Sequence, residues 1–147
     1  DIYLPSFFKT IVQDLQHGLE VAVDIKCDIV PITIKIDTFR LDIICKNLLS
    51  NALKYADPNK EEPFVYISVK TVDNLLHISF EDNGIGVAKV HLAKIFDMFY
   101  VTSHQNKGSG IGLYLAKEMV NKLGGEIAIA SIVGKGTTFS IKLPLAY

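Results

Sequence analysis

Residues 47–55 read NLLSNALKY and lie in the most strongly patterned part of the chain. Apolar residues recur around them at helical spacing, which predicts a helix that follows Asp37, a good N-cap residue, and runs to about residue 56. One stripe of that helix, at spacings of four, seven and eight residues, holds Asn47, Asn51, Lys54 and Tyr55. Asparagine is a poor helix former, so two on one apolar helix need an explanation. An exposed polar face is one explanation, and amide oxygens that face a ligand or metal are the other.

Periodic segments continue on both sides of this helix. Helical spacing predicts helices over residues 5–20, 37–56 and 110–123, with a short helical stretch near 87–95. Alternation of apolar and polar residues predicts strands over residues 21–27, 32–36, 64–71, 75–81, 126–132 and 137–143. The resulting order α-β-β-α-β-β-α-β-β predicts an α+β fold, a two-layer α/β sandwich in which a mostly antiparallel, mixed sheet carries three helices on one face.

The composition is that of an ordinary globular domain. With 147 residues, of which 49% are hydrophobic and 21% charged, we expect a single domain over residues 1–147. The net charge of −1 offers no basic excess, so nucleic acid is not an expected partner. No apolar stretch suggests a membrane span, and no signal peptide is recognisable. The first residue is Asp, and we expect the chain to be a fragment of a longer protein.

The cysteines and histidines point to no metal site. Cys27 and Cys45 lie in apolar surroundings without a CxxC motif, so we expect two reduced thiols packed as small hydrophobic side chains. A chain without a disulfide framework favours a reducing, cytoplasmic location. The four histidines share no i, i+4 spacing.

Three glycine clusters follow the predicted strands or begin a predicted helix. They are DNGIG (82–86), KGSGIG (107–112) and GKGT (134–137). Glycine lets the backbone approach a ligand closely, and free N–H groups at a helix start suit phosphate. The clusters match neither a P-loop nor a dinucleotide-binding fingerprint, and each alone could be a simple turn.

In this order the segments resemble the ATP-binding catalytic domain of bacterial sensor histidine kinases. That family belongs to a superfamily (GHKL) of gyrase, heat-shock chaperone, kinase and mismatch-repair ATPases with a Bergerat-type fold. Residues 47–55 resemble its N box, 82–86 the first glycine box, 95–99 the F box, 108–113 the second glycine box and 134–137 the last. Each box alone is a weak signal, but all five stand in register and cover nearly the whole chain.

The resemblance implies a site for ATP and Mg²⁺. It implies that the Asp82 carboxylate, which offers only acceptors, binds the adenine amino group. Gly84 and Gly86 would let the chain lie against the base, Tyr55 would line the pocket, and Thr137 would reach the adenine side. Asn51 would give its amide oxygen to Mg²⁺, and Asn47 would contact phosphate or a metal-bound water. The other residues implied in nucleotide binding are Lys54, Lys107, Gly108, Gly110, Ile111, Gly112 and Leu113.

The same resemblance favours phosphotransfer over hydrolysis. Related ATPases place a glutamate base four residues before the metal-binding Asn, where this chain has Asn47, which has no useful basicity. None of the histidines (His17, His77, His91 and His104) lies in an acceptor motif. We therefore expect a protein-histidine kinase domain with no catalytic residue of its own in this chain, whose acceptor His lies on a separate dimerisation hairpin domain.

Further expectations about partners come from the same resemblance. A response regulator receiver domain would be an indirect partner. The full-length protein would be a homodimer and the isolated domain a monomer, in the cytoplasm or as the cytoplasmic part of a membrane-anchored sensor. Family members often carry Arg in the lid, but residues 100–107 hold none, so two alternatives stay open. They are a nucleotide-binding regulatory domain with degenerate kinase activity and an ATPase of the same superfamily.

Overall fold

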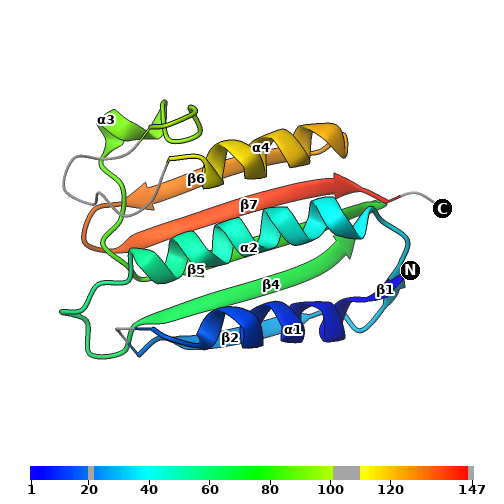
Figure 1. The fold of residues 1–147 in the computed structure, drawn as a ribbon, viewed down its shortest axis with the longest axis horizontal. Coiled ribbons are helices and arrows are strands. Elements are labelled where there is room, and N and C mark those ends of the chain that lie inside the picture. The colour runs from blue at the N-terminus through cyan, green and yellow to red at the C-terminus, as the bar shows by residue number, and fades with distance from the viewer. Residues whose placement is uncertain (20–21, 101–109, 146–147) are drawn as a thin grey trace.

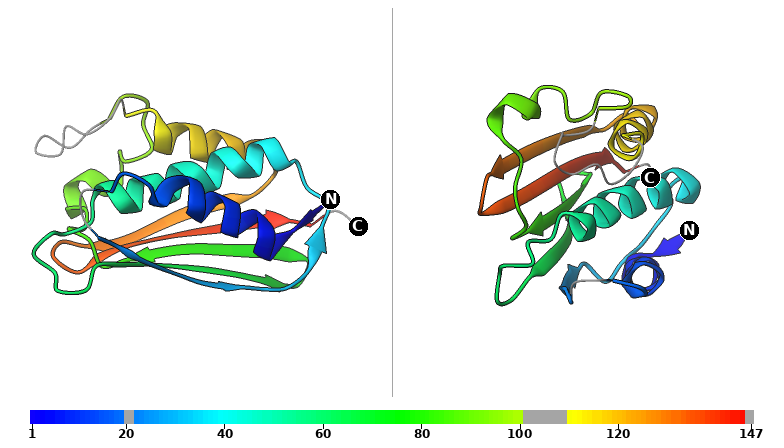
Figure 2. Two further views of the ribbon diagram at one scale, coloured as in Figure 1. Left: turned by 60° about the horizontal axis from the view of Figure 1, so that its bottom comes forward. Right: turned by 60° about the vertical axis from the view of Figure 1, so that its left-hand side comes forward.

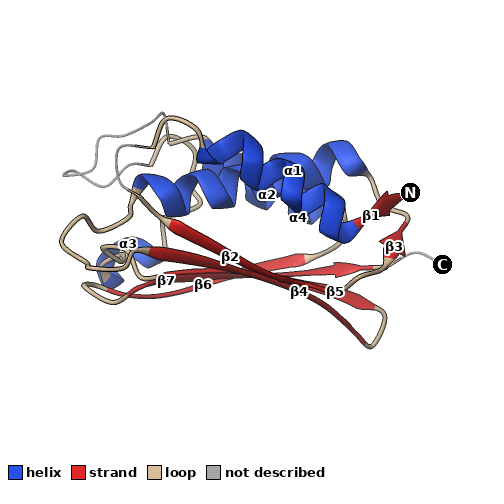
Figure 3. Ribbon diagram, turned by 90° about the horizontal axis from the view of Figure 1, so that it is seen from below, coloured by secondary structure: helices blue, strands red, loops and turns tan. Residues whose placement is uncertain are grey.

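The computed structural model describes residues 1–19, 22–100 and 110–145. A twisted five-stranded sheet forms one layer, and the three longer helices form the other on a single face (Figure 3). The strands, in spatial order, are β2 (Asp24–Ile29), β4 (Phe64–Val72), β5 (Leu75–Asp82), β7 (Gly136–Pro144) and β6 (Glu126–Ile132). β2 runs parallel to β4 and every other pair is antiparallel, so the predicted mixed two-layer architecture is confirmed.

Three helices cover the sheet side by side. They are α1 (Leu4–Gln16), α2 (Thr38–Lys54) and α4 (Gly112–Lys122), and α2 lies between the other two (Figures 1 and 2). The short α3 (Lys89–Leu92) lies at the end of the molecule near β6. The predicted cap of α2 is confirmed, because Asp37 Oδ1 accepts from the backbone N–H of Arg40 at 3.1 Å.

Alternation along the central strands builds the core beneath α2. Leu76, Ile78 and Phe80 of β5 are almost fully buried. So are Phe139, Ile141 and Leu143 of β7. Every second side chain of these neighbouring strands therefore faces the helices. The next core-facing positions in the same direction are polar, Asp82 on β5 and Thr137 on β7, which pair across the two strands. The core face thus ends in a polar patch at one end of the sheet.

The N-terminal strands differ from the sequence-based expectation. Ile2–Tyr3 forms a two-residue strand, β1, which the periodicity missed because two residues show no period. It pairs with β3 (Thr33–Ile34) in a separate two-stranded sheet, so the strand expected over residues 32–36 is short and stands outside the main sheet. β2 begins at Asp24 instead of residue 21.

The prediction for the cysteines is half right. Cys45 is fully buried in α2, but Cys27 is exposed on the edge strand β2, where no further strand covers it. Burial raises the pKa of both thiols, and that of Cys45 is raised far more. Within the described ranges, no helix is both long and apolar enough to cross a membrane.

Candidate functional site

Asp82 is the last residue of β5, and one of its two carboxylate oxygens is hydrogen-bonded to the protein backbone. Its Oδ1 accepts from the backbone N–H of Gly84 at 2.9 Å and from that of Thr137 at 3.2 Å. Oδ2 has no hydrogen-bond partner within residues 1–19, 22–100 and 110–145. Burial raises the pKa of Asp82 to about 6, although the two backbone N–H groups lower it and the nearby Glu81 raises it. The second oxygen is therefore available to a donor.

The loop after Asp82 is pressed against the end of α2. The backbone N–H of Ile85 donates to the carbonyl of Tyr55 at 3.1 Å. A β-carbon on Gly84 would collide with that carbonyl and lie 2.9 Å from Asp82 Oδ1, so only glycine fits. The Tyr55 side chain is half-buried, and burial raises its pKa. The sequence-predicted residues Tyr55, Asp82 and Gly84 are thus brought together.

The β6–β7 turn closes the other side of this loop. Gly134 N–H donates to the carbonyl of Ile85 at 2.9 Å, and Lys60 Nζ donates to the carbonyl of Gly134 at 2.7 Å. Gly86 has φ +77° and packs against the Ile132 carbonyl, where a β-carbon would collide. Glycine is therefore required at residue 86 both for its backbone conformation and for space.

Asn83 has a structural part in this loop. Its Oδ1 accepts from Phe64 N–H at 2.8 Å, and its Nδ2 donates to the carbonyl of Glu62 at 3.0 Å. The side chain therefore ties the loop to the start of β4. It stands in the first glycine box, but no motif indicates these contacts, since both partners lie about 20 residues away in sequence.

Ser131 on β6, like Lys60, is a residue at this site that the sequence motifs do not indicate. It stands opposite Thr137 on β7, which is 7% exposed, and the two hydroxyl oxygens are 2.7 Å apart. Ser131 Oγ also accepts from Val87 N–H at 2.7 Å and donates to the carbonyl of Gly136 at 3.0 Å. A single serine at the end of an alternating strand carries no motif signal, so only the sheet register could reveal it.

The second part of the site lies where α2 meets the start of α4. Asn47 Nδ2 donates to the carbonyl of Ile43 at 2.7 Å, which fixes the orientation of the amide. A β-carbon on Gly112 would lie 2.8 Å from Asn47 Oδ1, so the amide oxygen lies against the first turn of α4. The side chain of its N-cap residue, Ile111, forms no capping hydrogen bond, and the first turn of α4 holds no acidic residue. Its N–H groups are oriented as an anion would need.

The asparagine stripe is neither buried core nor an exposed face. Asn47 and Asn51 are both half-buried, and Lys54 is exposed one turn beyond them. Eight residues of helix separate Asn47 from Tyr55, a rise of about 12 Å that an extended nucleoside triphosphate can span. The predicted residues Lys107 and Gly108 lie outside the described residues.

Gly110, two residues before the start of α4, lies against the last residue of the F box, Phe99. Gly110 has φ +75°, its carbonyl accepts from Phe99 N–H at 2.9 Å, and a β-carbon there would lie 2.8 Å from Phe99 Cα. Ile111 is the N-cap residue of α4, and Leu113 in its first turn packs against the core. Phe96 anchors the F box, because its ring packs edge-on against Phe139 with centroids 6.1 Å apart.

The polar side chains of α2 include an oxygen donor of the kind that Mg²⁺ accepts. Among the described residues, no group of three or more His, Cys, Asp or Glu side chains could hold a metal ion. Asn51 offers a hard amide oxygen, and Mg²⁺ takes few protein ligands because it keeps waters and binds substrate phosphates. A single amide oxygen on α2, near the uncapped N-terminus of α4, is consistent with that coordination habit.

The described histidines have other surroundings. His91 in α3 is hydrogen-bonded through Nδ1 to the hydroxyl of Tyr100. His77 is half-buried in β5, and His17 is the exposed C-cap residue of α1. His104 lies outside the described residues.

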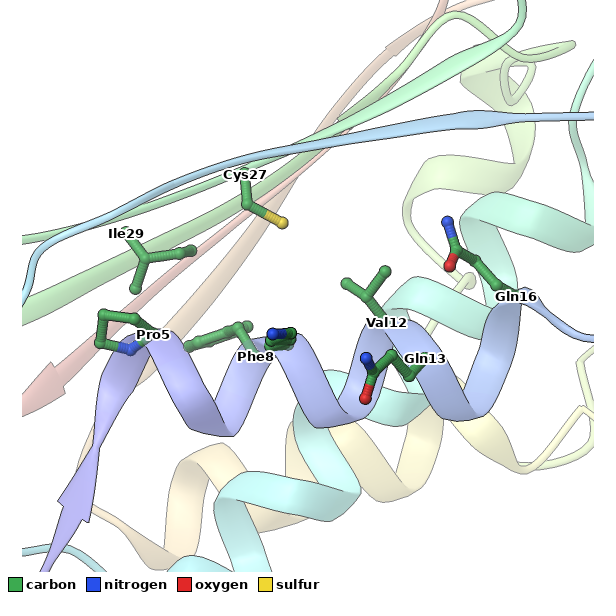
Figure 4. Close-up of a pocket in the computed structure, with 8 residues that line it drawn as sticks. Pro5, Phe8, Val12, Gln13, Gln16, Cys27 and Ile29 are labelled. Atoms are coloured by element: carbon green, nitrogen blue, oxygen red, sulfur yellow. The ribbon is translucent and has the colours of Figure 1, made fainter.

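A separate hollow of about 480 Å³ lies between α1 and β2, with Phe8, Val12, Cys27 and Ile29 among its lining residues (Figure 4). It contains none of the predicted site residues.

Curated relatives match about three quarters of the chain. The sensor histidine kinase WalK of Bacillus subtilis is 41% identical over 115 residues, which are 76% of this chain and 19% of that protein. The sensor protein SrrB of Staphylococcus aureus is 37% identical over 112 residues, 74% of this chain and 19% of that protein. The chain therefore spans about a fifth of the length of these relatives.

Solved structures share the whole fold. The mycobacterial sensor histidine kinase MprB superposes with a TM-score of 0.82 at 21% identity, over 96% of this chain and 93% of that one. Full-length ShkA, solved in complex with AMPPNP, gives a TM-score of 0.83 at 26% identity, over 96% of this chain and 30% of that one. Residues 36–147 match the family model of histidine kinase-, DNA gyrase B- and HSP90-like ATPases. The chain belongs to this ATPase family, and WalK and MprB, which it resembles, are named sensor histidine kinases.

Proposed function

We propose that this domain binds Mg²⁺-ATP and donates the γ-phosphate to a histidine on a separate dimerisation hairpin domain. The observation that carries the proposal is the arrangement along α2. Asp82 and its glycine loop lie against Tyr55 at one end, and Asn47 meets the start of α4 two turns away. This arrangement supports a base site at the C-terminal end of α2 and a phosphate site about two turns earlier, at the spacing of a nucleotide.

Adenine is selected by acceptors at the base end. Asp82 Oδ1 is held by two backbone N–H groups, so Oδ2 is left to accept from the exocyclic amino group. Gly84 and Gly86 hold the loop against the backbone of Tyr55 and Ile132, Thr137 stands opposite Asp82 on β7, and Tyr55 would line the pocket. A base with a carbonyl in place of the amino group would set oxygen against oxygen.

The phosphates lie at the start of α4. The N–H groups that follow Gly110, at Ile111, Gly112 and Leu113, offer donors and a positive helix end. Lys54 on α2, together with Lys107 and Gly108 from the sequence, completes the set. Asn51 would hold Mg²⁺ through its amide oxygen, and Asn47 would contact phosphate or a metal-bound water. When bound, the ion neutralises phosphate charge.

Asn47 favours transfer to a protein over hydrolysis. Its amide donates to the Ile43 carbonyl, and its oxygen has no useful basicity, so it does not remove a proton from water. An attacking histidine needs no such base, because a neutral imidazole nitrogen is itself a nucleophile. We place the acceptor on another domain, because none of the four histidines of this sequence lies in an acceptor motif.

The remaining parts of the proposal concern the parent protein. A homodimer formed through the hairpin domain would present the acceptor histidine, and a response regulator would then take the phosphate. The cytoplasm, where ATP is plentiful, is the compartment that we propose for the domain. The sequence of the lid, with no Arg between residues 100 and 107, keeps a regulatory domain with degenerate kinase activity as the second candidate.

Binding at the proposed site is tested by titration followed by amide NMR. Mg²⁺ with a non-hydrolysable ATP analogue should shift the amide signals of Gly84, Thr137 and Gly112 together, at one affinity. Amides in the hollow between α1 and β2, such as that of Val12, are the internal control and should not move. The proposed site would be refuted if the titration shifted only the amide signals of the α1–β2 hollow, or if no signal moved.

A further inference from the structure

Three polar side chains form a row across three neighbouring strands at the end of the core face. Asp82 on β5 stands opposite Thr137 on β7, and Thr137 stands opposite Ser131 on β6. Opposite residues of antiparallel strands point to the same face of the sheet, so all three side chains lie on the helix-bearing side. Ser131 is the outermost member and is separated from the proposed adenine contact of Asp82 by Thr137.

The Ser131 hydroxyl has three neighbours and one hydrogen. Val87 N–H can only donate to it, at 2.7 Å. The Gly136 carbonyl can only accept from it, at 3.0 Å. The third neighbour is Thr137 Oγ1, at 2.7 Å, which can donate or accept. Two of the three partners have a fixed role, so the direction of the Ser131–Thr137 bond is set by how Ser131 uses its single hydrogen.

We propose that Ser131 is a positioning residue for base selection, because it fixes which way the Thr137 hydroxyl points into the adenine pocket. The proposal rests on the proposed function. Ser131 gives its single hydrogen to the Gly136 carbonyl, so the bond between the two hydroxyls uses the hydrogen of Thr137. Thr137 is then left with only acceptor lone pairs toward the base.

A Thr137 hydroxyl that can only accept distinguishes adenine from hypoxanthine. Adenine carries an amino donor at position 6 and an acceptor at N1, whereas hypoxanthine carries a carbonyl at position 6 and an N1–H, so donor and acceptor are exchanged at these two positions. The fixed Thr137 hydroxyl matches the amino group of adenine and opposes the carbonyl of hypoxanthine. Without Ser131 the hydroxyl rotates freely and adapts to both bases, so the preference narrows.

The test compares the affinities for ATP and inosine triphosphate, measured by calorimetry on the intact chain. Ser131→Ala should lower the ratio of the ATP affinity to the inosine triphosphate affinity by about tenfold. This is the effect expected when one mismatched donor–acceptor contact is relieved. Ser131→Thr keeps a hydroxyl and should retain the wild-type ratio within about twofold. Ser140→Ala, an exposed serine on β7, is the matched control and should change neither affinity. A merely structural loss would weaken both nucleotides equally and leave their ratio unchanged.

A double-mutant cycle shows whether Ser131 acts through Thr137. Thr137→Val places a residue that suits a β-strand and leaves Ser131 in place, and it should by itself lower the ratio of ATP to inosine triphosphate affinity. Ser131→Ala added to Thr137→Val should then change this ratio by less than twofold. If Ser131→Ala does not fold, Thr137→Val still decides, because an unchanged ratio would overturn the proposal. A full wild-type preference for ATP in Ser131→Ala would overturn it too. Absence of ATP binding in the wild type would overturn the proposed function as well.

Discussion

Replacing Asp82 with Asn should make the nucleotide-free domain more stable. Burial raises the pKa of Asp82 from an ordinary value of 3.8 to about 6, so the ionised form is disfavoured in the folded state by ~3 kcal/mol. Asn is neutral, and its Oδ1 can still accept from the backbone N–H groups of Gly84 and Thr137. At pH 7 we expect a gain of ~1–3 kcal/mol, or roughly 2–4 °C in melting temperature for each kcal/mol.

The same change should weaken ATP binding. Oδ2 becomes an amide nitrogen, which offers donors where the adenine amino group needs an acceptor. Loss of a charge-assisted hydrogen bond is worth about 1.5–3 kcal/mol, so affinity should fall by roughly 10- to 150-fold. The variant should therefore gain stability and lose function together, as expected where a buried carboxylate is kept for its ligand.

The pH dependence has a definite sign. The pKa of Asp82 is higher in the folded state, so this group contributes stability at pH values below about 4, and the contribution is lost as the pH rises through 6. The stability gain of Asp82→Asn should hence appear at pH 7 and vanish near pH 4. Below pH 6 the wild-type ATP affinity should fall by about tenfold for each pH unit, because Asp82 becomes protonated. Protonation of the phosphates also weakens binding, and the affinity of Asp82→Asn over the same pH range measures that separate loss.

Thermal unfolding and calorimetry at pH 4 to 8 measure both effects. Glu81→Gln is the matched control, because it removes the neighbouring, exposed carboxylate of β5 and should change ATP affinity little. If Asp82→Asn left ATP affinity unchanged and lowered the melting temperature at pH 7, both the base contact and the cost of burying this carboxylate would be refuted.

The remaining predictions concern the glycine loop, the metal and the nucleotide-dependent protection of the backbone. Gly84→Ala should lower ATP affinity more than tenfold, because its β-carbon displaces the loop from Tyr55; Gly134→Ala, with φ +81° but no neighbour within 4 Å, should cost only about 1 kcal/mol of stability, and equal effects on ATP binding would contradict this. Asn51→Ala should weaken ATP binding in Mg²⁺ but not in excess chelator; the same loss in both would exclude Asn51 as a metal ligand. Hydrogen exchange at Gly112 should slow when Mg²⁺-ATP binds, and an unchanged rate would place the phosphates elsewhere.

The layers of the fold could be predicted because the periodicity of its long elements is strong. The strands of residues 64–72 and 75–82 alternate cleanly on a buried face, and Asp37 caps α2 as expected. Short elements could not be found: β1 holds two residues, and its pairing with β3 depends on tertiary contact. Cys27 was wrongly expected to be packed because apolar neighbours in sequence do not show that a strand lies at the sheet edge.

The motifs indicated the site residues but not how the structure holds them. Glycine at residues 84 and 86 indicates close backbone approach, and a β-carbon at either position would collide with a carbonyl of the chain itself, that of Tyr55 or Ile132. Contact of these glycines with a base stays a prediction. Ser131 and Lys60 could not be predicted, since each contacts a residue on another element that sequence spacing does not bring near. The sequence pattern leaves open whether Asn47 belongs to an exposed polar face or faces a ligand. In the structure its amide oxygen lies against the first turn of α4, a contact that sequence spacing does not show.

Incubation with γ-labelled ATP tests the central claim most directly, because it follows the phosphate itself. The domain is incubated alone and with the dimerisation hairpin of its parent protein, and free phosphate and phosphohistidine are both counted. We expect the domain alone to release phosphate very slowly, since it has neither an activated water nor a placed acceptor, and the added hairpin to gain acid-labile phosphohistidine. Rapid phosphate release by the domain alone, abolished by Asn47→Ala, would contradict the account and make the protein a hydrolase.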